Sequence, residues 1–177
     1  VSPYYAAINA GKKVVRLDLK STDGKRAFER LVAAADVLIE SFRPGRLAKI
    51  GLGPDRLRAL NPRLVHVALS GYGQSVPLKD AAGHDLNYLA RSGGLGYGGQ
   101  AGGAPAMPGV QVGDIGGGSL FALVGILAAL PERARTGRGR LVDDRLLFAG
   151  RERRSMTYVP GGDIVDQAVR DATRALE

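Results

Sequence analysis

The sequence predicts an α/β fold in which a parallel sheet carries helices on its faces. Two observations support this prediction. Short β-branched runs alternate with amphipathic stretches across residues 14–69, which is typical of parallel strands joined by right-handed crossovers. A Gly-rich part follows, because the chain has 26 glycines among 177 residues and most of the excess lies between residues 71 and 118. Glycine serves where backbone approaches a ligand closely or adopts positive φ, although a flexible loop has the same composition.

The first strand and helix are predicted near the start of the chain. Residues 14–19 (VVRLDL) form a β-branched run that predicts a strand. Ser21 or Thr22 can then cap a helix over residues 24–35. The apolar positions at helical spacing in this helix are Phe28, Leu31, Val32 and Ala35.

Further elements follow in regular order. Residues 37–39 predict a second strand, a turn follows at residues 43–45, and a short helix at 54–60 leads to a third strand at 64–69. In the Gly-rich part we expect one helix from His84 to about Arg91. A second should begin just after Asp114 and end near Leu130. Beyond Asp163 the apolar residues again share one face, which predicts an amphipathic helix in the tail.

Composition excludes several kinds of site. The chain has no cysteine and two histidines, which excludes disulfides, thiolate nucleophiles and a His-built metal centre. The net charge of +8 attracts polyanions. The basic residues are scattered and aromatic residues make up only 6%, so no platform for stacking bases is predicted. A small phosphorylated ligand therefore fits this charge better than nucleic acid.

No membrane segment or secretion signal is expected. The most apolar run, residues 120–130, is shorter than the roughly 18 to 20 residues that cross a bilayer. The start of the chain lacks a basic region followed by an apolar one. We therefore expect a soluble cytoplasmic protein without membrane partners. Because the chain opens with Val1 rather than Met, we also expect its true beginning to be missing.

Two acid/base candidates lie at Gly-marked helix starts. His84 follows Gly83, so its imidazole should lie beside free backbone N–H groups, which favour its neutral, proton-accepting form. Asp114 precedes a Gly-Gly-Gly run, where it can act in proton transfer at a cleft or simply cap the helix. Each residue alone is more often structural than catalytic. The GGGS run matches neither a Walker loop nor GxGxxG.

Basic residues near strand ends are candidates for phosphate binding. Lys20, Arg43 and Lys49 follow the predicted first and second strands, and ligands bind at the carboxyl ends of strands in open α/β sheets. Each of the three, taken singly, is also consistent with a solvated surface charge.

Taken together, these segments resemble a known family. The matching motifs, in chain order, are NAGKKVVRLDLK, DVLIESFRPG, GLGPDRLRALNPRLVHVALSGYGQ, AGHDLNYLARSG, GDIGGGS and GILAALPERARTGRGRLVD. The stretch from Asn9 to about Asp143 resembles the family III CoA-transferases (CaiB/BaiF), and within them the α-methylacyl-CoA racemases. The branch rests on the GHD motif at residues 83–85, where transferase members tend to carry GYD or GFD.

The resemblance implies a fold and a set of site residues. The fold would be a partial Rossmann-like parallel sheet with flanking helices, as in a truncated form of the family's large domain. His84 and Asp114 would be the catalytic pair. Lys49 replaces an Arg of the racemases, which keeps the charge but loses the bidentate geometry. The implied contacts to CoA are Leu17, Asp18, Leu19, Lys20, Ser41, Phe42, Arg43, Lys49, Gly83, Asp85, Leu86, Asn87 and Tyr88.

The resemblance also implies an activity. His84 and Asp114 would exchange the α-proton of a 2-methylacyl-CoA through an enolate, with no cofactor beyond the CoA of the substrate. Asp85 would either orient His84 or cap its helix, and we favour the cap. We assign residues 1–143 to a partial CoA-binding and catalytic domain and 144–177 to a divergent tail. We expect the family's small domain to be absent and the enzyme to be incomplete, although full-length members of the family would form homodimers. The alternatives are a CoA-transferase with Asp114 as nucleophile and an inactive CoA-binding fragment.

Overall fold

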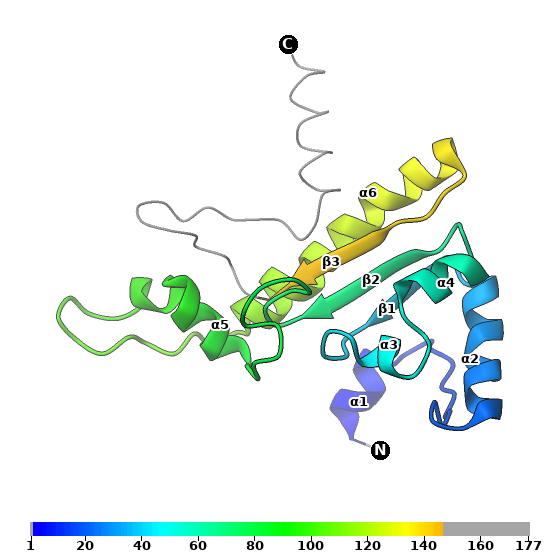
Figure 1. Ribbon diagram of the computed structural model, residues 1–177. Coiled ribbons are helices and arrows are strands. Elements are labelled where there is room, and N and C mark those ends of the chain that lie inside the picture. The colour runs from blue at the N-terminus through cyan, green and yellow to red at the C-terminus, as the bar shows by residue number, and fades with distance from the viewer. Residues whose placement is uncertain (1, 147–177) are drawn as a thin grey trace, which may run out of the picture.

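A computed structural model describes residues 2–146, which form a three-stranded parallel sheet with helices on both faces (Figure 1). The strands are β1 (Val37–Glu40), β2 (Val65–Ser70) and β3 (Leu141–Arg145), in the order β1-β2-β3. In the sheet register, Ala68 of the central strand lies opposite Glu40 on one side and Asp143 on the other. The α/β class that the sequence predicts is therefore the observed one.

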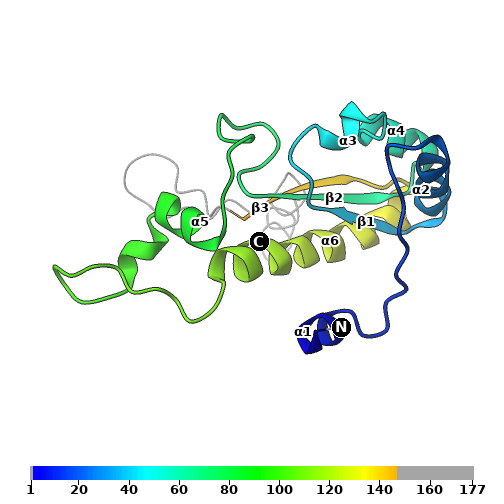
Figure 2. The same ribbon diagram turned by 90° about the horizontal axis from the view of Figure 1, so that it is seen from below.

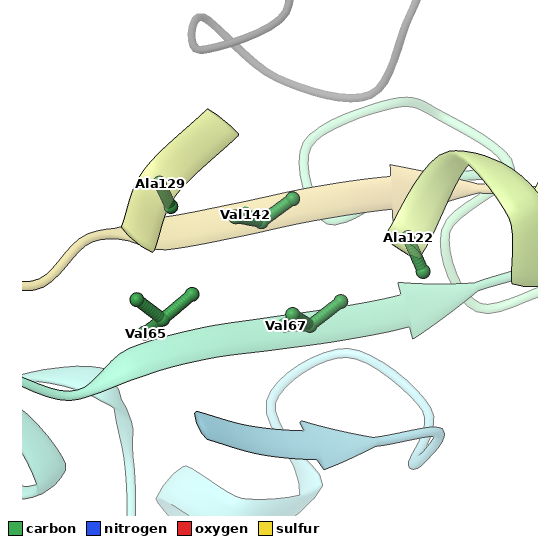
Figure 3. Close-up of a cluster of buried hydrophobic side chains, with 5 residues drawn as sticks. All are labelled: Val65, Val67, Ala122, Ala129 and Val142. Carbon is green, nitrogen blue, oxygen red and sulfur yellow. The ribbon is translucent and has the colours of Figure 1, made fainter. Parts of the chain in front are cut away.

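Helix α6 (Phe121–Thr136) covers one face of the sheet (Figure 2). Val65 and Val67 of β2 and Val142 of β3 point toward Ala122 and Ala129 of this helix, and all five side chains are buried (Figure 3). Small residues on α6 let the helix approach the sheet closely. This apolar layer is the main core of the described chain.

The opposite face carries α3 (Arg46–Lys49) and α4 (Pro54–Leu60), with α2 (Thr22–Ala34) packed beside α4 (Figure 2). Val32, Leu57 and Leu64 form a second buried cluster there. The Ser21 hydroxyl accepts a hydrogen bond from the Gly24 N–H at 3.0 Å, which confirms Ser21 as the cap of α2. Leu31, by contrast, is 53% exposed and does not belong to the packed face.

The prediction of a strand at residues 14–19 is wrong. This segment forms neither helix nor strand, and Val14 and Val15 are largely exposed. Its β-branched composition gives it strand propensity, but a strand also needs a neighbour for its backbone N–H and C=O groups. Within residues 2–146 the segment has no such neighbour, because β1 pairs only with β2. The β3 strand, in turn, was not foreseen.

The Gly-rich part contains α5 (Asp85–Ser92), the 3₁₀ turn η1 (Gly94–Tyr97) and the π-helix η2 (Val112–Leu120). Helix α5 lies close to its expected position. The second expected helix begins earlier, since Asp114 lies in the first turn of η2 rather than before it. The helix also continues through Pro131 to Thr136, where Gly137 ends it with φ 73°.

Helices η2 and α6 are continuous over Val112–Thr136, and this helix is long and apolar enough to cross a membrane by length and composition. The expectation that no segment reaches this length is therefore wrong. In the structure one face of the helix packs on the sheet through Ala122, Gly125 and Ala129.

Two remaining features concern the ends of the described chain. A short helix, α1 (Pro3–Ile8), begins at Ser2, whose hydroxyl accepts a hydrogen bond from the Tyr5 N–H. Strand β3 runs across residue 143, the boundary that the sequence suggested between the catalytic part and the tail. The amphipathic helix predicted beyond Asp163 lies outside the described residues.

Candidate active site

A cleft of about 300 Å³ lies at the carboxyl ends of β1 and β2. Open α/β sheets bind their ligands at this end of the strands. Of the fifteen residues named from the sequence, those that line the cleft are Ser41, Phe42, Arg43, Gly83, His84 and Tyr88. Arg43 and Lys79 bring positive charge to it, and the described lining residues include no Asp or Glu. The cleft is therefore suited to an anionic ligand.

His84 is the residue from which α5 starts. It has extended backbone geometry, with φ −135° and ψ 177°, and its N–H donates to the side-chain oxygen of Asn87 at 2.9 Å. The first N–H groups of a helix have no partner within it. Among residues 2–146 nothing accepts from the N–H groups of Asp85 and Leu86. The start of α5 thus places two free backbone donors beside the exposed imidazole of His84.

Asp114 lies in the first turn of η2 and is held from two sides. Its backbone N–H donates to Oδ1 of Asp85 at 2.8 Å, and its Oδ2 accepts from Nε2 of Gln111 at 3.2 Å. Asp85 is buried, so its carboxylate joins α5 to η2. The expectation that Asp85 caps its own helix is wrong, because His84 is the N-cap residue and the Asn87 side chain accepts from its N–H. Asp114 does not cap a helix either, since the residue at the N-cap of η2 is Gln111.

The electrostatics of Asp114 connect it with His84. Burial and the nearby Asp85 carboxylate raise the pKa of Asp114, whereas the charge of His84 lowers it. The hydrogen bond from the Asp114 N–H to Asp85, the residue after His84, places the two residues on contacting helices. A carboxyl group whose pKa is raised is protonated at higher pH than usual, so it can both accept and return a proton.

Tyr88 anchors the loop that leads into His84. Its hydroxyl donates to the carbonyl of Gly83 at 2.6 Å, and its ring meets Tyr72 edge to face at 5.2 Å between centroids. A Cβ atom at Gly83 would lie 2.7 Å from the Tyr88 ring, and one at Gly71 would lie 2.5 Å from its hydroxyl. These glycines permit a close approach of backbone to a buried aromatic ring, whereas the glycine content was expected to serve a ligand.

Other residues named from the sequence do not line the cleft. Asp18 shapes the turn before α2, where its Oδ1 accepts from the Lys20 N–H at 2.9 Å. Lys49 is exposed at the end of α3. Asp114 lies outside the lining as well, although Asp85 ties it to α5. The remaining members of this group, all named for contact with CoA, are Leu17, Leu19, Lys20, Asp85, Leu86 and Asn87. Their assignment to CoA stays a prediction.

Sequence reasoning missed three residues that belong to this region. Lys79 and Leu146 line the cleft, and Gln111 holds Asp114. The sequence around Gln111 and around Leu146 contains no motif that indicates a functional site. Lys79 could have been found, because a cation four residues before Gly83 must enter the same loop. Within residues 2–146 no group of three His, Cys, Asp or Glu side chains could hold a metal ion.

Comparison with known proteins places this arrangement in a family. Residues 1–162 match the family model described as CoA-transferase family III. The chain belongs to this family. The α-methylacyl-CoA racemase of Mus musculus is 45% identical over 137 residues, which cover 77% of this chain and 36% of that protein. The succinyl-CoA:glutarate CoA-transferase of Mus musculus is 36% identical over 146 residues, covering 82% and 33%.

Solved structures of the family share the fold. A CaiB/BaiF family protein from Brucella suis superimposes with a TM-score of 0.75 at 32% identity, covering 92% of this chain and 40% of that one. The Rv3272 protein of Mycobacterium tuberculosis gives 0.69 at 38% identity, covering 77% and 38%. The resemblance inferred from the motifs is confirmed. This family III chain spans about two fifths or less of the length of these relatives.

Proposed function

We propose that this family III chain provides the proton-transfer centre of an α-methylacyl-CoA racemase-like enzyme. The substrate would be a 2-methylacyl-CoA, whose phosphates suit the cationic cleft. The observation that carries the proposal is the pairing of His84 with Asp114. His84 begins α5 and lines the cleft, and Asp114 of η2 is bound through its N–H to Asp85, the residue after His84. Burial raises the pKa of Asp114, and the charge of His84 opposes this rise.

The reaction needs a base and an acid on opposite faces of the α-carbon. One of the pair takes the α-proton, and the electrons of the broken C–H bond move onto the thioester oxygen to give an enolate. The other group, in its protonated form, then donates a proton to the opposite face. The free N–H groups of Asp85 and Leu86 are suited to stabilise the enolate oxygen. No redox step is involved, and the two groups exchange roles in the reverse direction.

Solvent isotope exchange tests this proposal directly. We expect the protein that carries this chain to incorporate deuterium at C2 of (2R)-2-methylacyl-CoA in D₂O and to produce the 2S epimer. His84→Ala and Asp114→Asn should each lower the epimerisation rate by at least about 10²-fold, the scale of a lost acid/base group. Asp23→Asn is the matched control, because the Asp23 side chain is 95% exposed and lies outside the cleft. Near-normal epimerisation by both His84 and Asp114 variants would exclude the assignment.

CoA transfer is the second candidate, and the CoA-transferases among the relatives favour it. Here the Asp114 carboxylate would attack the thioester, release CoA thiolate and form a mixed anhydride. A substitution of His84 distinguishes racemisation from CoA transfer. Loss of its imidazole should abolish epimerisation but leave formation of an acyl-enzyme, detected as a hydroxamate after hydroxylamine treatment.

A further inference from the structure

A buried pair of polar side chains lies behind the wall of the cleft. Glu40 at the end of β1 and His66 of β2 are 11% and 7% exposed at their side chains, and Oε1 lies 3.7 Å from Nε2. That distance is too long for a hydrogen bond. Within residues 2–146 the Nε2 atom of His66 has no hydrogen-bond partner. Buried polar atoms are normally satisfied, so the pair calls for an explanation.

The second oxygen of Glu40 connects this pair with the cleft. Its Oε2 accepts a hydrogen bond from the Phe42 N–H at 2.7 Å, which closes the turn at the end of β1. Residues 41–43 follow in that turn and form one wall of the cleft. Hydrogen bonds to a carboxylate are short and stronger than those between neutral groups. The conformation of the wall therefore depends on where the Glu40 carboxylate points.

Close packing alone does not fix this carboxylate. His66 lines two small cavities of about 20 and 40 Å³, and Glu40 also lines the larger one. Arg43 and Arg46 line the same cavity as Glu40, and their charges would compete with the Phe42 N–H for its carboxylate. The His66 ring, which belongs to the neighbouring strand β2, lies next to the Glu40 carboxylate.

We infer that Glu40 is a positioning residue for the ligand-binding wall and that His66 holds Glu40 in place. This inference rests on the proposed function, because it assumes that residues 41–43 contact the CoA ester. Glu40 acts by keeping the Phe42 N–H bound, which presents Ser41 and Arg43 to the cleft. It takes no part in proton transfer, so its loss should weaken binding while leaving turnover at saturation unchanged.

Three variants of the whole chain test the inference. Glu40→Ala removes the acceptor, Glu40→Gln keeps an acceptor oxygen, and His66→Ala removes the support. Glu29→Ala is the matched control, because Glu29 forms its ion pair with Arg56 on α2 and α4, away from the cleft. Far-UV circular dichroism establishes that each variant is folded. Amide exchange of Phe42 by NMR and the affinity for CoA by calorimetry are then measured.

Glu40→Ala should speed exchange of the Phe42 N–H and raise the Kd for CoA, each by about tenfold, as expected for loss of a hydrogen bond to a charged acceptor. Glu40→Gln should stay within about threefold of the unaltered chain. His66→Ala should act in the same direction as Glu40→Ala but add nothing in the Glu40→Ala background. In turnover assays KM should rise with kcat unchanged.

The outcomes separate the inference from the proposed function. Unchanged Phe42 exchange in Glu40→Ala, or altered exchange with unchanged CoA affinity, overturns the inference and leaves the proposed function standing. Failure of the unaltered chain to bind CoA overturns both. If Glu40→Ala does not fold, His66→Ala decides, because an unaltered Phe42 amide in that variant refutes the role of the pair.

Discussion

Replacing Asp144 by Asn should make folding of the chain much less sensitive to pH. Asp144 lies on β3 and is only 2% exposed, and nothing among residues 2–146 hydrogen-bonds its Oδ2. Burial raises its pKa from 3.8 to about 7, an effect that the Arg145 N–H opposes and the neighbouring Asp143 reinforces. The native state therefore favours a protonated Asp144 carboxyl, whereas the unfolded chain ionises it readily.

The size and the sign of the effect follow from linkage. The contribution of Asp144 to stability is fully present below pH 3.8, where the carboxyl is protonated in both states, and is lost as the pH rises to about 7. The difference between these two values corresponds to about 4 kcal/mol, which is a large fraction of the stability of a small domain. Asn cannot ionise, so the Asp144→Asn variant should escape this loss.

Urea unfolding followed by circular dichroism measures the free energy of unfolding at several pH values between 4 and 7.5. The advantage of Asp144→Asn over the unaltered chain should grow by about 1.4 kcal/mol per pH unit up to about pH 7 and then level off. Asp23→Asn is the control, because its side chain is 95% exposed and should show no such trend. A constant difference between Asp144→Asn and the unaltered chain across this range would refute the reasoning.

Two further predictions concern contacts near the cleft, and a third concerns the core between α6 and β3. Asp85→Ala removes the acceptor of the Asp114 N–H and should lower the epimerisation rate while CoA affinity stays within about threefold, measured by kinetics and calorimetry. Tyr88→Phe removes the 2.6 Å bond to the Gly83 carbonyl and should destabilise the chain by about 1 kcal/mol in urea unfolding. Gly125→Ala places a Cβ atom 2.8 Å from a methyl group of β3 and should destabilise the chain by about 1 to 3 kcal/mol, whereas a Tm equal to that of the unaltered chain would contradict the observed packing.

The sequence was sufficient where local pattern and tertiary packing agree. Helix α2 has a capping serine and a face that meets α4, and β2 is a mostly apolar run that is buried on both faces. Sequence-based prediction failed where a neighbouring strand or helix decides the structure of a segment. Residues 14–19 have strand propensity without a neighbouring strand, and β3 was hidden because its two Asp residues, one of them buried, interrupt the apolar run.

In the candidate site, too, local features could be predicted from the sequence and contacts between distant residues could not. Glycine followed by His84 indicated the start of α5, because the signal for a helix start is local. The hydrogen bond from the Asp114 N–H to Asp85 joins residues 29 positions apart. No local sequence pattern predicts such a contact, whereas an acidic residue at a helix start does predict a cap. The sequence does not predict the role of Glu40 either. An acidic residue beside a turn is common, and only the structure brings His66 next to the Glu40 carboxylate.

Two sets of contacts build the site, and they come from different parts of the chain. The proposed proton-transfer pair is held by the hydrogen bond from the Asp114 N–H of η2 to Asp85 of α5. The cationic wall follows β1 and is held by Glu40. The sets meet at Tyr88, which packs against Gly71 after β2 while its hydroxyl bonds to Gly83. Binding and proton transfer should therefore respond to separate substitutions, and a change at Tyr88 should disturb both at once.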